Sequence, residues 1–351
     1  MILQSFSYKE PDWGLANLSP LTPVTLLVAR NATGKTRSVR ALQNVTSFLQ
    51  MKDIPNRTFT AEMEFADRTD TSWTMQYSFR VNEGVVEKET LAVCGKTLIK
   101  RTKVTAKYEN EKITPPSDKL VVQIRRDRSL YPEIERLMQW TEGVTSVYCS
   151  DINPLTILGM GKSLNAYSLS DLVDLLSSSE QQTVQKYAKS LGYNISSLKT
   201  IEASRGLRLV QIKEKSVTNE LVDMQLSNGM LRTLYLLCFA SVIKHDKKLS
   251  MLLIDDFGEG LDYRRSVDLG KIIFDDCEKN GVQLIVSSND AFLMDMVNIA
   301  NWQVLVRKNS LVSAINPSTA PTLFKEFRMT GLSNFDLFSS DFIDNYLNKS
   351  K

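Results

Sequence analysis

Residues 22–36 read TPVTLLVARNATGKT, an apolar run of strand length followed by a short polar loop. Beyond the loop, apolar residues recur at helical spacing, at Val39, Leu42, Val45 and Leu49. A strand, a loop and a helix in this order can bind phosphate, because the free N–H groups of the loop and of the helix N-terminus point at the anion. We therefore predict a phosphate-binding loop over residues 29–36.

The loop contains the residue types that nucleotide chemistry needs. In such a P-loop the lysine reaches the β- and γ-phosphate oxygens, and the following hydroxyl binds Mg²⁺. We predict ATP as the ligand, Mg²⁺ as its metal and Thr36 as a metal ligand. The predicted nucleotide-binding residues here are Arg30, Asn31, Ala32, Thr33, Gly34, Lys35 and Thr36. Ala29 stands where these loops usually carry their first glycine.

A second apolar run ends in acids, in the stretch LLIDDFGEGLD at 252–262. In a nucleotide-binding sheet, a strand that ends in Asp places a carboxylate beside Mg²⁺, and the next acid can orient the attacking water. We assign Asp255 to the metal and Asp256 to the water. Glu259 is a secondary catalytic candidate, if the turn through Gly258 and Gly260 folds it back. A solvated acidic turn is the alternative.

A third stretch, LSNGMLRTLYLL at 226–237, places Ser227 and Gly229 just before a helical pattern. A helix N-terminus preceded by serine and glycine is another place where phosphate can bind. The chain therefore contains two predicted phosphate-binding helix ends.

Taken together and in this order, the stretches resemble the ABC ATPase superfamily. ARNATGKT resembles its Walker A motif, LSNGM its signature, LLIDD its Walker B motif, and residues 260–262 its D-loop, which adds Asp262 to the nucleotide-binding candidates. The form LSNGMLR is more similar to soluble members, the overcoming-lysogenisation-defect (OLD-like) and chromosome-maintenance groups, than to the LSGGQ of transporter subunits. The resemblance covers roughly residues 1–50 and 224–310.

The resemblance implies a homodimer in which two heads enclose ATP, with Ser227 and Gly229 of one chain at the γ-phosphate bound by the other. Two positions depart from the family pattern. Asp256 replaces the usual glutamate and is one methylene shorter, and Asn289 stands where a histidine is usual. An amide can donate a hydrogen bond to phosphate but cannot carry a proton as imidazole does. We therefore expect slow or gated hydrolysis.

We predict an α/β fold, an ABC-type ATPase head whose P-loop sheet is flanked by helices, with an antiparallel β lobe and a helical insertion. The predicted parts of this single head are a Walker A lobe (1–55), a β-rich arm (56–130), a helical insertion (131–222), a signature, Walker B and D-loop lobe (223–316) and a helical tail (317–351). Strict alternation predicts strands at 59–65 and 73–81. Further strands are predicted at 251–254 and 282–286, in a largely parallel sheet, and helices from about 230 and over 264–279.

Composition excludes several classes of protein. The chain has 351 residues, 42% of them hydrophobic, and a net charge of only +3. Four scattered cysteines do not form a disulfide framework or zinc pattern. No apolar run reaches the ~18 residues that a membrane helix needs. We expect a cytoplasmic protein that does not use a membrane.

A basic stretch lies within the β-rich arm, without an acid between Glu89 and Glu109. Its members are Lys96, Lys100, Arg101, Lys103 and Lys107. Such a cluster can bind the phosphates of a nucleic acid; an exposed strand whose charges prevent aggregation is the alternative. Tyr8 and Trp13 are placed either to stack on adenine or to pack in the core. His245, the single histidine, lies in the charged segment KHDKK and is expected to be a plain surface residue.

The functional prediction is an ABC-type ATPase that hydrolyses ATP slowly, forms a dimer or larger assembly around ATP–Mg²⁺, and drives or gates an effector protein. The resemblance suggests a setting in anti-phage defence. The alternatives are a scaffold held together by ATP without significant hydrolysis, a nucleic-acid-binding ATPase of the DNA-repair type, and a transporter subunit.

Overall fold

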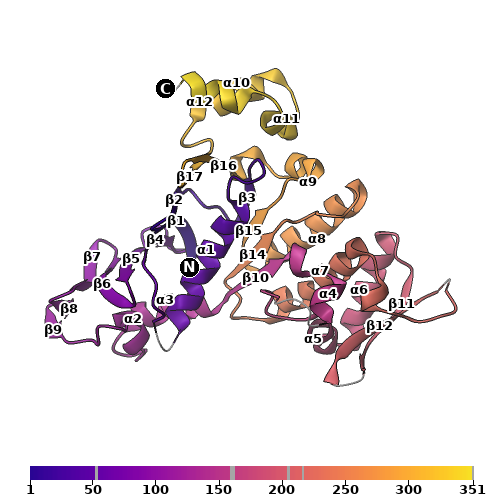
Figure 1. Cartoon of the computed structure of the whole chain (residues 1–351), viewed down its shortest axis with the longest axis horizontal. Helices are drawn as coiled ribbons and strands as arrows, with labels where there is room; N and C mark the ends of the chain where they lie inside the picture. The colour runs from indigo at the N-terminus through magenta and orange to yellow at the C-terminus, as the bar shows by residue number, and fades with distance from the viewer. Residues whose placement is uncertain (52–53, 159–162, 204–205, 216, 350–351) are drawn as a thin grey trace. The chain divides into compact units, whose positions relative to one another are not determined.

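A computed structural model describes the chain except residues 52–53, 159–162, 204–205, 216 and 350–351. The chain forms two compact units, each described by itself below (Figure 1). Unit 1 comprises Met1–Val144, Lys248–Met251 and Asn298–Lys351, and unit 2 comprises Thr145–Lys247 and Leu252–Val297.

Unit 1 is built on strands in the order β3-β16-β17-β2-β1-β4-β5-β6-β7-β8-β9. Parallel pairing joins β3 to β16 and β17 to β2, whereas β1 and β4 to β9 form an antiparallel meander. The strand bounds are β1 Ile2–Glu10, β2 Trp13–Leu18, β3 Val24–Val28, β4 Phe59–Ala66, β5 Thr74–Asn82, β6 Val85–Val93, β7 Lys96–Thr102, β8 Ala106–Tyr108, β9 Glu111–Ile113, β16 Trp302–Lys308 and β17 Leu311–Ile315.

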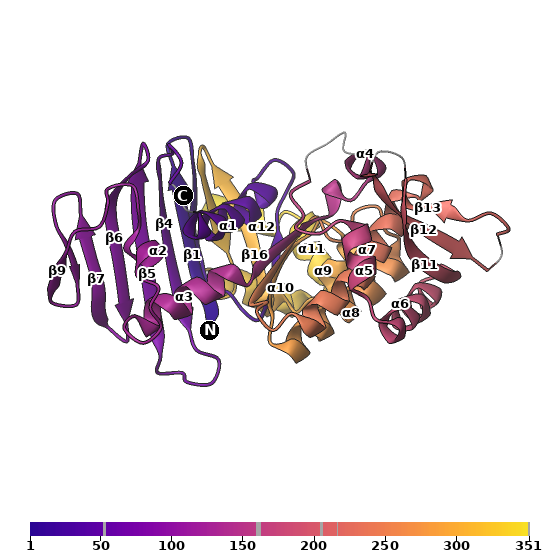
Figure 2. The ribbon, with the colours of Figure 1, turned by 90° about the horizontal axis from the view of Figure 1, so that it is seen from below.

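Helices α1 (Lys35–Gln50), α2 (Val121–Ile124) and α3 (Pro132–Glu142) cover one face of the meander (Figure 2). Alternate residues of β4 and β5 point into this layer, as the sequence predicts. Phe48 of α1 meets Phe59 edge-on at 4.8 Å between ring centroids and stacks on Phe79 at 5.6 Å. Aromatic contacts of this kind bury large apolar areas and hold the helices on the sheet.

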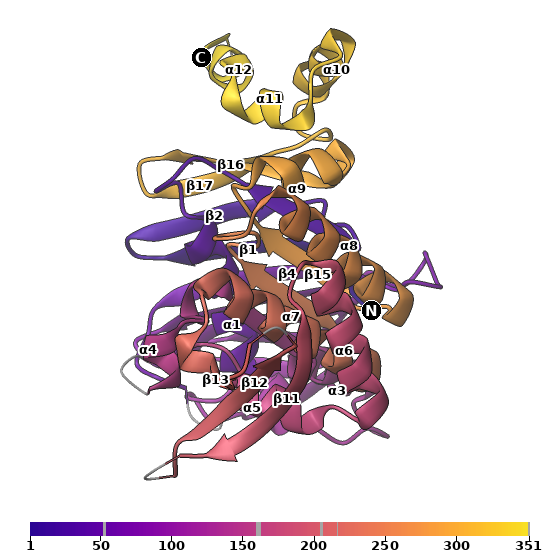
Figure 3. The ribbon, with the colours of Figure 1, turned by 90° about the vertical axis from the view of Figure 1, so that its right-hand side faces the viewer.

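The C-terminal tail belongs to unit 1 and consists of α10 (Pro321–Thr330), α11 (Asn334–Ser339) and α12 (Phe342–Lys349) (Figure 3). The tail follows β17 in the chain. A short helix, η4 (Ile299–Asn301), lies before β16. Phe324 and Phe327 are each only 2% exposed, and Phe327 meets Phe342 edge-on at 5.4 Å. These helices lie within the segment 317–351 for which the sequence predicts a helical tail.

Unit 2 contains the strand order β10-β14-β15, apart from the first residues of β10 and β14. Helix α7 is buried from Met230 to Ile243 and is contacted by α5, α6 and α8. The bounds are β10 Val144–Tyr148, η1 Cys149–Asp151, α4 Pro154–Ile157, α5 Leu169–Leu175, α6 Ser178–Ser190, η3 Asp223–Gln225, α7 Asn228–His245, β14 Met251–Asp255, α8 Tyr263–Asn280, β15 Gln283–Ser287 and α9 Ala291–Met296.

A small antiparallel sheet lies in the segment for which the sequence predicts helices. Its strands are β11 (Ile195–Glu202), β12 (Arg208–Glu214) and β13 (Leu221–Val222). Helices α3 to α6 are present as predicted, but the apolar residues of β11 and β12 pair across strands, for example Leu198 with Ile212. Cross-strand packing of this kind is nonlocal, which is why helix periodicity elsewhere in 131–222 did not reveal it.

Local signals in unit 2 agree with the structure. Ser177 caps α6 and exchanges hydrogen bonds with Glu180 in a capping box, and Gly192 takes a left-handed backbone (φ +88°) just past the helix. In the described part of the chain, no helix combines the length and the hydrophobicity needed to traverse a bilayer.

Candidate functional site

The predicted P-loop lies in unit 1 between β3 and α1, as the sequence indicates. Gly34 precedes the helix with φ +118°, a conformation that side-chain-bearing residues rarely adopt. A Cβ at this position would lie 3.3 Å from the Val312 side chain of β17. Glycine is therefore required here for two reasons, its backbone conformation and the limited space around it.

Lys35 is turned back into the loop. Its side chain is buried, and its Nζ donates a hydrogen bond to the Ala29 carbonyl at 2.8 Å. Ala29 is fully buried and does not have a positive φ, so the alanine found in place of the usual glycine causes no backbone strain. Ala32, in contrast, is left-handed at φ +63°. A charged amine inside the curve of the loop is placed to meet phosphate oxygens.

The remaining predicted P-loop residues are brought together by the same turn. Arg30, Asn31 and Ala32 are exposed, and Thr33 and Thr36 are half-buried. The N-cap residue of α1 is Gly34, which has no side chain that could cap the first turn. Uncapped N–H groups at a helix start are available to an anion.

Tyr8 and Trp13 lie in the core. Tyr8 is 8% exposed and Trp13 is 2% exposed. The Arg37 guanidinium lies over the Trp13 ring, 4.8 Å from its centroid, and pairs with Glu10. Of the two sequence interpretations, core packing is the one that the structure supports, because no open ring face is offered to adenine.

Asp255 ends β14 in unit 2 and is only 1% exposed. One of its oxygens, Oδ1, accepts a hydrogen bond from Ser287 Oγ at 2.6 Å, and that hydroxyl accepts one from the Asp256 N–H at 2.9 Å. Ser287 ends β15, so a single serine hydroxyl links both acids to the neighbouring strand. Sequence reasoning did not select Ser287, although the pair of serines after LIV is visible in the sequence.

Asp256 has a left-handed backbone with φ +56°. This region is uncommon for non-glycine residues, although aspartate is among those that tolerate it best. The conformation is held by the N–H bond to Ser287 and by the following N–H of Phe257, which donates to the Ser287 carbonyl at 2.9 Å. Backbone strain that neighbouring bonds enforce often marks a functional position.

The start of α7 brings the signature-like residues against the turn after Asp256. Ser227 is exposed and caps the helix, its Oγ accepting from the Met230 N–H at 3.3 Å. A Cβ on Gly229 would lie 2.7 Å from the Gly260 carbonyl oxygen. Gly229 is therefore required for close backbone packing, whatever it does for phosphate.

Glu259 has a partner that the sequence did not suggest. Arg232 of α7 donates from Nη1 to the Glu259 carbonyl at 2.7 Å, and its Nη2 lies 3.5 Å from the Glu259 carboxylate. Arg232 is largely buried, whereas the Glu259 side chain is 55% exposed. The Glu259 carboxylate is thus held by an ion pair to Arg232 of α7.

The last two predicted site residues also lie in unit 2. Asp262 caps α8, its Oδ1 accepting from the Arg265 N–H at 3.1 Å and its Oδ2 lying 2.6 Å from Arg265 Nη1. Asn289 is exposed and follows β15, one residue before the Asp290 cap of α9. Both positions have the local setting expected of them, at the ends of strands and the starts of helices.

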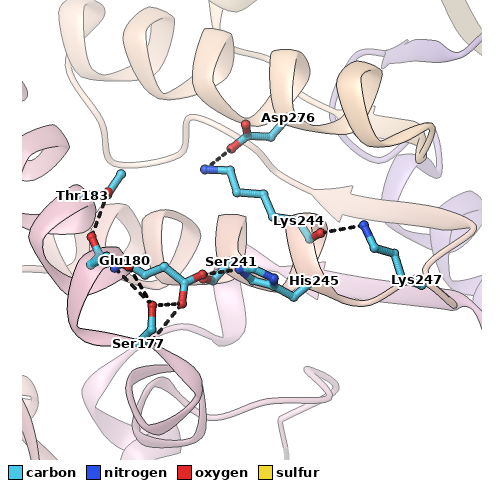
Figure 4. A network of polar contacts seen from close by, with 9 residues as sticks. Ser177, Glu180, Thr183, Ser241, Lys244, His245, Lys247 and Asp276 are labelled. Carbon is cyan, nitrogen blue, oxygen red and sulfur yellow. Dashed lines mark hydrogen bonds and ion pairs between the residues drawn. The ribbon is translucent and has the colours of Figure 1, made fainter.

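His245 is more than the plain surface residue expected from its charged segment. Its ring is 70% exposed, yet Nε2 donates to Glu180 Oε1 at 2.6 Å, and Ser241 donates to the same oxygen (Figure 4). Burial raises the pKa of Glu180, but the hydrogen bonds from Ser177, Ser241 and His245 outweigh it and hold the pKa at about 2. The network ties the end of α7 to the start of α6.

One of the predicted nucleic-acid contacts is wrong. Arg101 is only 4% exposed, because it points into the face of the sheet that the helices cover. Its guanidinium donates to the carbonyls of Pro116 and Lys119 and lies 3.9 Å from the fully buried Glu89. Burial raises the pKa of Glu89 to about 7, against the lowering effect of the N–H groups at the start of α2.

The four lysines of the predicted cluster are exposed. Lys96 lies 2.5 Å from Glu109, and Lys103 lies 2.8 Å from Glu87. The register places Lys100, Lys107 and Lys112 directly opposite one another on β7, β8 and β9. Like charges facing one another across strands are destabilising, so an anion that binds there would relieve the repulsion.

The chain has a mixed α/β fold with a large sheet, flanking helices, a loop of the predicted P-loop sequence between β3 and α1, and a separate small antiparallel sheet. Among solved structures, the crystal structure of an SMC head bound to the C-terminal winged-helix domain of ScpA matches with a TM-score of 0.55. The two chains are 12% identical, and the match covers 90% of this chain and 97% of that chain. At this identity the likeness establishes the fold.

Two further SMC heads match with lower scores. The head from Thermotoga maritima has a TM-score of 0.49 at 11% identity, covering 90% of this chain and 99% of that chain. The head from Pyrococcus furiosus, with an extended coiled coil and bound to the C-terminal domain of ScpA, has 0.48 at 10%, covering 93% and 99%. No family model matches the sequence, and no curated protein matches it significantly.

Proposed function

We propose that the chain is a cytoplasmic ATPase that binds ATP with Mg²⁺, hydrolyses it slowly and works as a single head of the soluble, OLD-like and chromosome-maintenance branch. The observation that carries the proposal is the P-loop, with its glycine-dependent turn, its lysine folded into the loop and a glycine at the N-cap of the helix. Together these features provide a positive charge and free N–H donors to one anion.

Mg²⁺ is assigned to Thr36 and Asp255. A threonine hydroxyl and a carboxylate are hard oxygen donors of the kind this ion prefers, and the Asp255 carboxylate is held in place by Ser287. When bound, the ion neutralises charge that develops on the phosphates.

Asp256 is assigned to the attacking water. Its carboxylate accepts a hydrogen bond from the water and orients it toward the γ-phosphorus, where a new P–O bond forms as the bond to the ADP oxygen breaks. Asn289 donates to the γ-phosphate. Since Asp256 is one methylene shorter than the glutamate of the family, we expect turnover to be slow. Glu259 stays a secondary catalytic candidate, which would have to leave its ion pair with Arg232 before it could act.

We further propose that two chains close on ATP, with Ser227, Gly229 and Asp262 of one chain reaching the nucleotide held by the other. Closure of the dimer then drives or gates an effector protein. The setting of anti-phage defence is suggested only by the family resemblance. The matched SMC head is bound to a winged-helix domain, which supports a protein partner of comparable kind for this head.

Steady-state ATP hydrolysis by the purified chain tests the proposal. Asp256→Ala should lower kcat by about 10²- to 10⁴-fold while ATP still binds, because general-base positioning contributes on this scale. Asp256→Glu restores the reach of the family's residue and should raise kcat. A native chain whose turnover is unchanged by Asp256→Ala would remove Asp256 from the mechanism. A chain that binds ATP and dimerises without turnover is the ATP-held scaffold.

A nucleic-acid-binding ATPase is the second candidate, favoured by the facing lysines Lys100, Lys107 and Lys112. Lys96 and Lys103 already have acidic partners and are weaker contacts. The variant Lys100→Glu/Lys107→Glu should abolish any stimulation of turnover by DNA or RNA and flatten the salt dependence of binding. Stimulation that survives this double change would assign the nucleic acid to another surface.

A further inference from the structure

A cavity of about 400 Å³ lies beside the P-loop within unit 1. Its walls come from three parts of the chain: the loop itself at residues 30–33, strand β16 with residues 304–307, and the tail with Phe338, Ile343, Asp344 and Leu347. A C-terminal segment therefore forms part of the surroundings of the loop that is proposed to bind ATP. The tail has no counterpart in the motifs discussed above.

Two walls of the cavity hold the loop in different ways. Arg307 of β16 donates from Nη1 to the Ala32 carbonyl at 3.4 Å, so it binds backbone. On the tail side, the Asp344 carboxylate lies 2.7 Å from Arg30 Nη2. The β16 contact uses an atom that the nucleotide does not need, whereas the tail contact uses a side chain predicted to bind nucleotide.

The Arg30–Asp344 ion pair is weak enough to be exchanged. The two side chains are 60% and 42% exposed, and exposed ion pairs contribute about 0.2–1 kcal/mol. Besides this pair, the contacts of α12 include the buried Ile343, the edge-on contact of Phe342 with Phe327 on α10, and packing against α11. Helix α10 shares Phe327 with this contact but also buries Leu323 and Phe324, so α12 can leave the loop while α10 stays folded.

The charges on the two sides of Arg30 conflict. A nucleoside triphosphate brings several negative charges to the loop, and Asp344 already places a carboxylate on the same guanidinium. A phosphate bound to Arg30 would lie near the Asp344 carboxylate, and like charges at short distance repel each other. The nucleotide and the tail therefore compete.

We propose that α12 is a displaceable lid on the P-loop, an inference that rests on ATP binding there. In the nucleotide-free protein Asp344 pairs with Arg30 and keeps α12 against the loop. A bound triphosphate takes over Arg30 and releases α12, which uncovers the loop for a second copy of the chain. The tail thereby makes closure of the dimer conditional on nucleotide.

Hydrogen exchange of the full chain with and without Mg-ATP tests the lid. ATP should slow exchange in the P-loop and speed exchange in residues 342–348. Asp344→Asn should speed exchange in α12 without nucleotide and tighten ATP binding by about two- to fivefold, the range that an exposed ion pair allows. Asp341→Asn, at an exposed position of the same tail, is the matched control and should change neither. Ile343→Ala, which weakens the apolar contact instead, should also speed exchange in α12.

The outcomes separate the lid from the proposed function. Protection of the P-loop by ATP without faster exchange in α12 overturns the lid and leaves ATP binding intact, as does an Asp344→Asn chain that behaves like Asp341→Asn. If ATP protects the P-loop of neither the native chain nor Asp344→Asn, the proposed function fails and the lid fails with it.

Discussion

Helices α1 and α7 both have a glycine at or near their first residue, but their first turns are built differently. At α1, the N-cap residue Gly34 takes φ +118° and has no side chain that could cap the helix. At α7, Ser227 caps the first turn and Gly229 packs against the Gly260 carbonyl. The first helix start is open to an anion, whereas the second is partly satisfied by its own chain.

The difference assigns separate tasks to the two helix starts. An uncapped turn with a lysine folded into it has donors ready for phosphate within one chain. A capped, exposed serine can still present its hydroxyl to a phosphate held by another molecule. This is the division of work that a dimer closed around ATP requires, and the variants below test each half of it.

Loss of the lysine at the open helix start should have the largest effect. Lys35→Ala removes a charge-assisted hydrogen bond to phosphate, worth about 1.5–3 kcal/mol, so the Kd for ATP should rise about 10- to 150-fold in equilibrium titration. Arg40→Ala, at an exposed position of the same helix, should leave the Kd within about twofold. Equal effects of the two variants would contradict a specific role for Lys35.

At the other helix start, Gly229→Ala should destabilise the chain. A Cβ would lie 2.7 Å from the Gly260 carbonyl oxygen, and overpacking typically costs about 1–3 kcal/mol. Urea unfolding should show the loss, while the exposed neighbour change Asn228→Ala should stay within about 0.5 kcal/mol. A neutral Gly229→Ala would mean that the turn at Gly260 relaxes, and phosphate binding would then be the main reason for the glycine.

Two variants separate the capping role of Ser227 from its proposed contact with phosphate. Ser227→Ala removes the cap and should cost about 1 kcal/mol in urea unfolding. Ser227→Asp keeps a cap but adds a negative charge, so it should preserve stability and still weaken ATP-dependent dimerisation in analytical ultracentrifugation. Dimerisation that Ser227→Asp leaves intact would place the phosphate contact elsewhere.

The smallest effect concerns the far end of α7. Glu180 has its pKa lowered to about 2 in the folded chain, against about 4.3 when unfolded, so its stabilisation is present above about pH 4.3 and is lost as the pH falls toward 2. Glu180→Gln should therefore lower the free energy of unfolding at pH 7 by about 1 kcal/mol, a value reduced for solvent screening. The difference from the native chain should vanish near pH 2.

Denaturant unfolding of both chains at several pH values measures this difference. Glu278→Gln, at an exposed position of α8, serves as the control without such a network. A gap that stays constant from pH 7 down to acid would show that the helix cap, rather than the charge of Glu180, supplies the stability.

Much of the site could be predicted because its signals are local. The spacing of apolar residues around ARNATGKT, the acids after LLI and the serine and glycine at the start of α7 each depend on a few neighbouring residues, and the structure forms the predicted element at each place. The roles of the site residues stay predictions until ligands are measured.

The alternation of strand β7 carried a local signal that Arg101 is buried, whereas the count of positive charges around it suggested an exposed residue. Ile99 and Arg101 lie two residues apart on β7, so both point to the same face of the strand, and that face is buried. Glu89 lies opposite Arg101 in the register and supplies the buried partner. A count of positive charges could not detect this, whereas strand alternation could have.

Other contacts had no local signal at all. Asp344 lies 314 positions beyond Arg30, and the two meet only because β16 and the tail fold back on the loop. Arg232 reaches Glu259 across 27 positions, and Ser287 reaches the acids at the end of β14 from the next strand. Such pairings depend on which elements become neighbours.

The sequence by itself determined the strands and helices around the three motifs and the motif residues themselves, because those follow from side-chain periodicity and from hydrogen bonds within a few residues. Only the tertiary structure decided that Arg101 is buried, that Gly229 is needed for its contact with Gly260, and that Asp344 lies on Arg30. The physical reason is that burial and pairing of charges depend on atoms that are close in space, and chain connectivity does not specify which atoms those are.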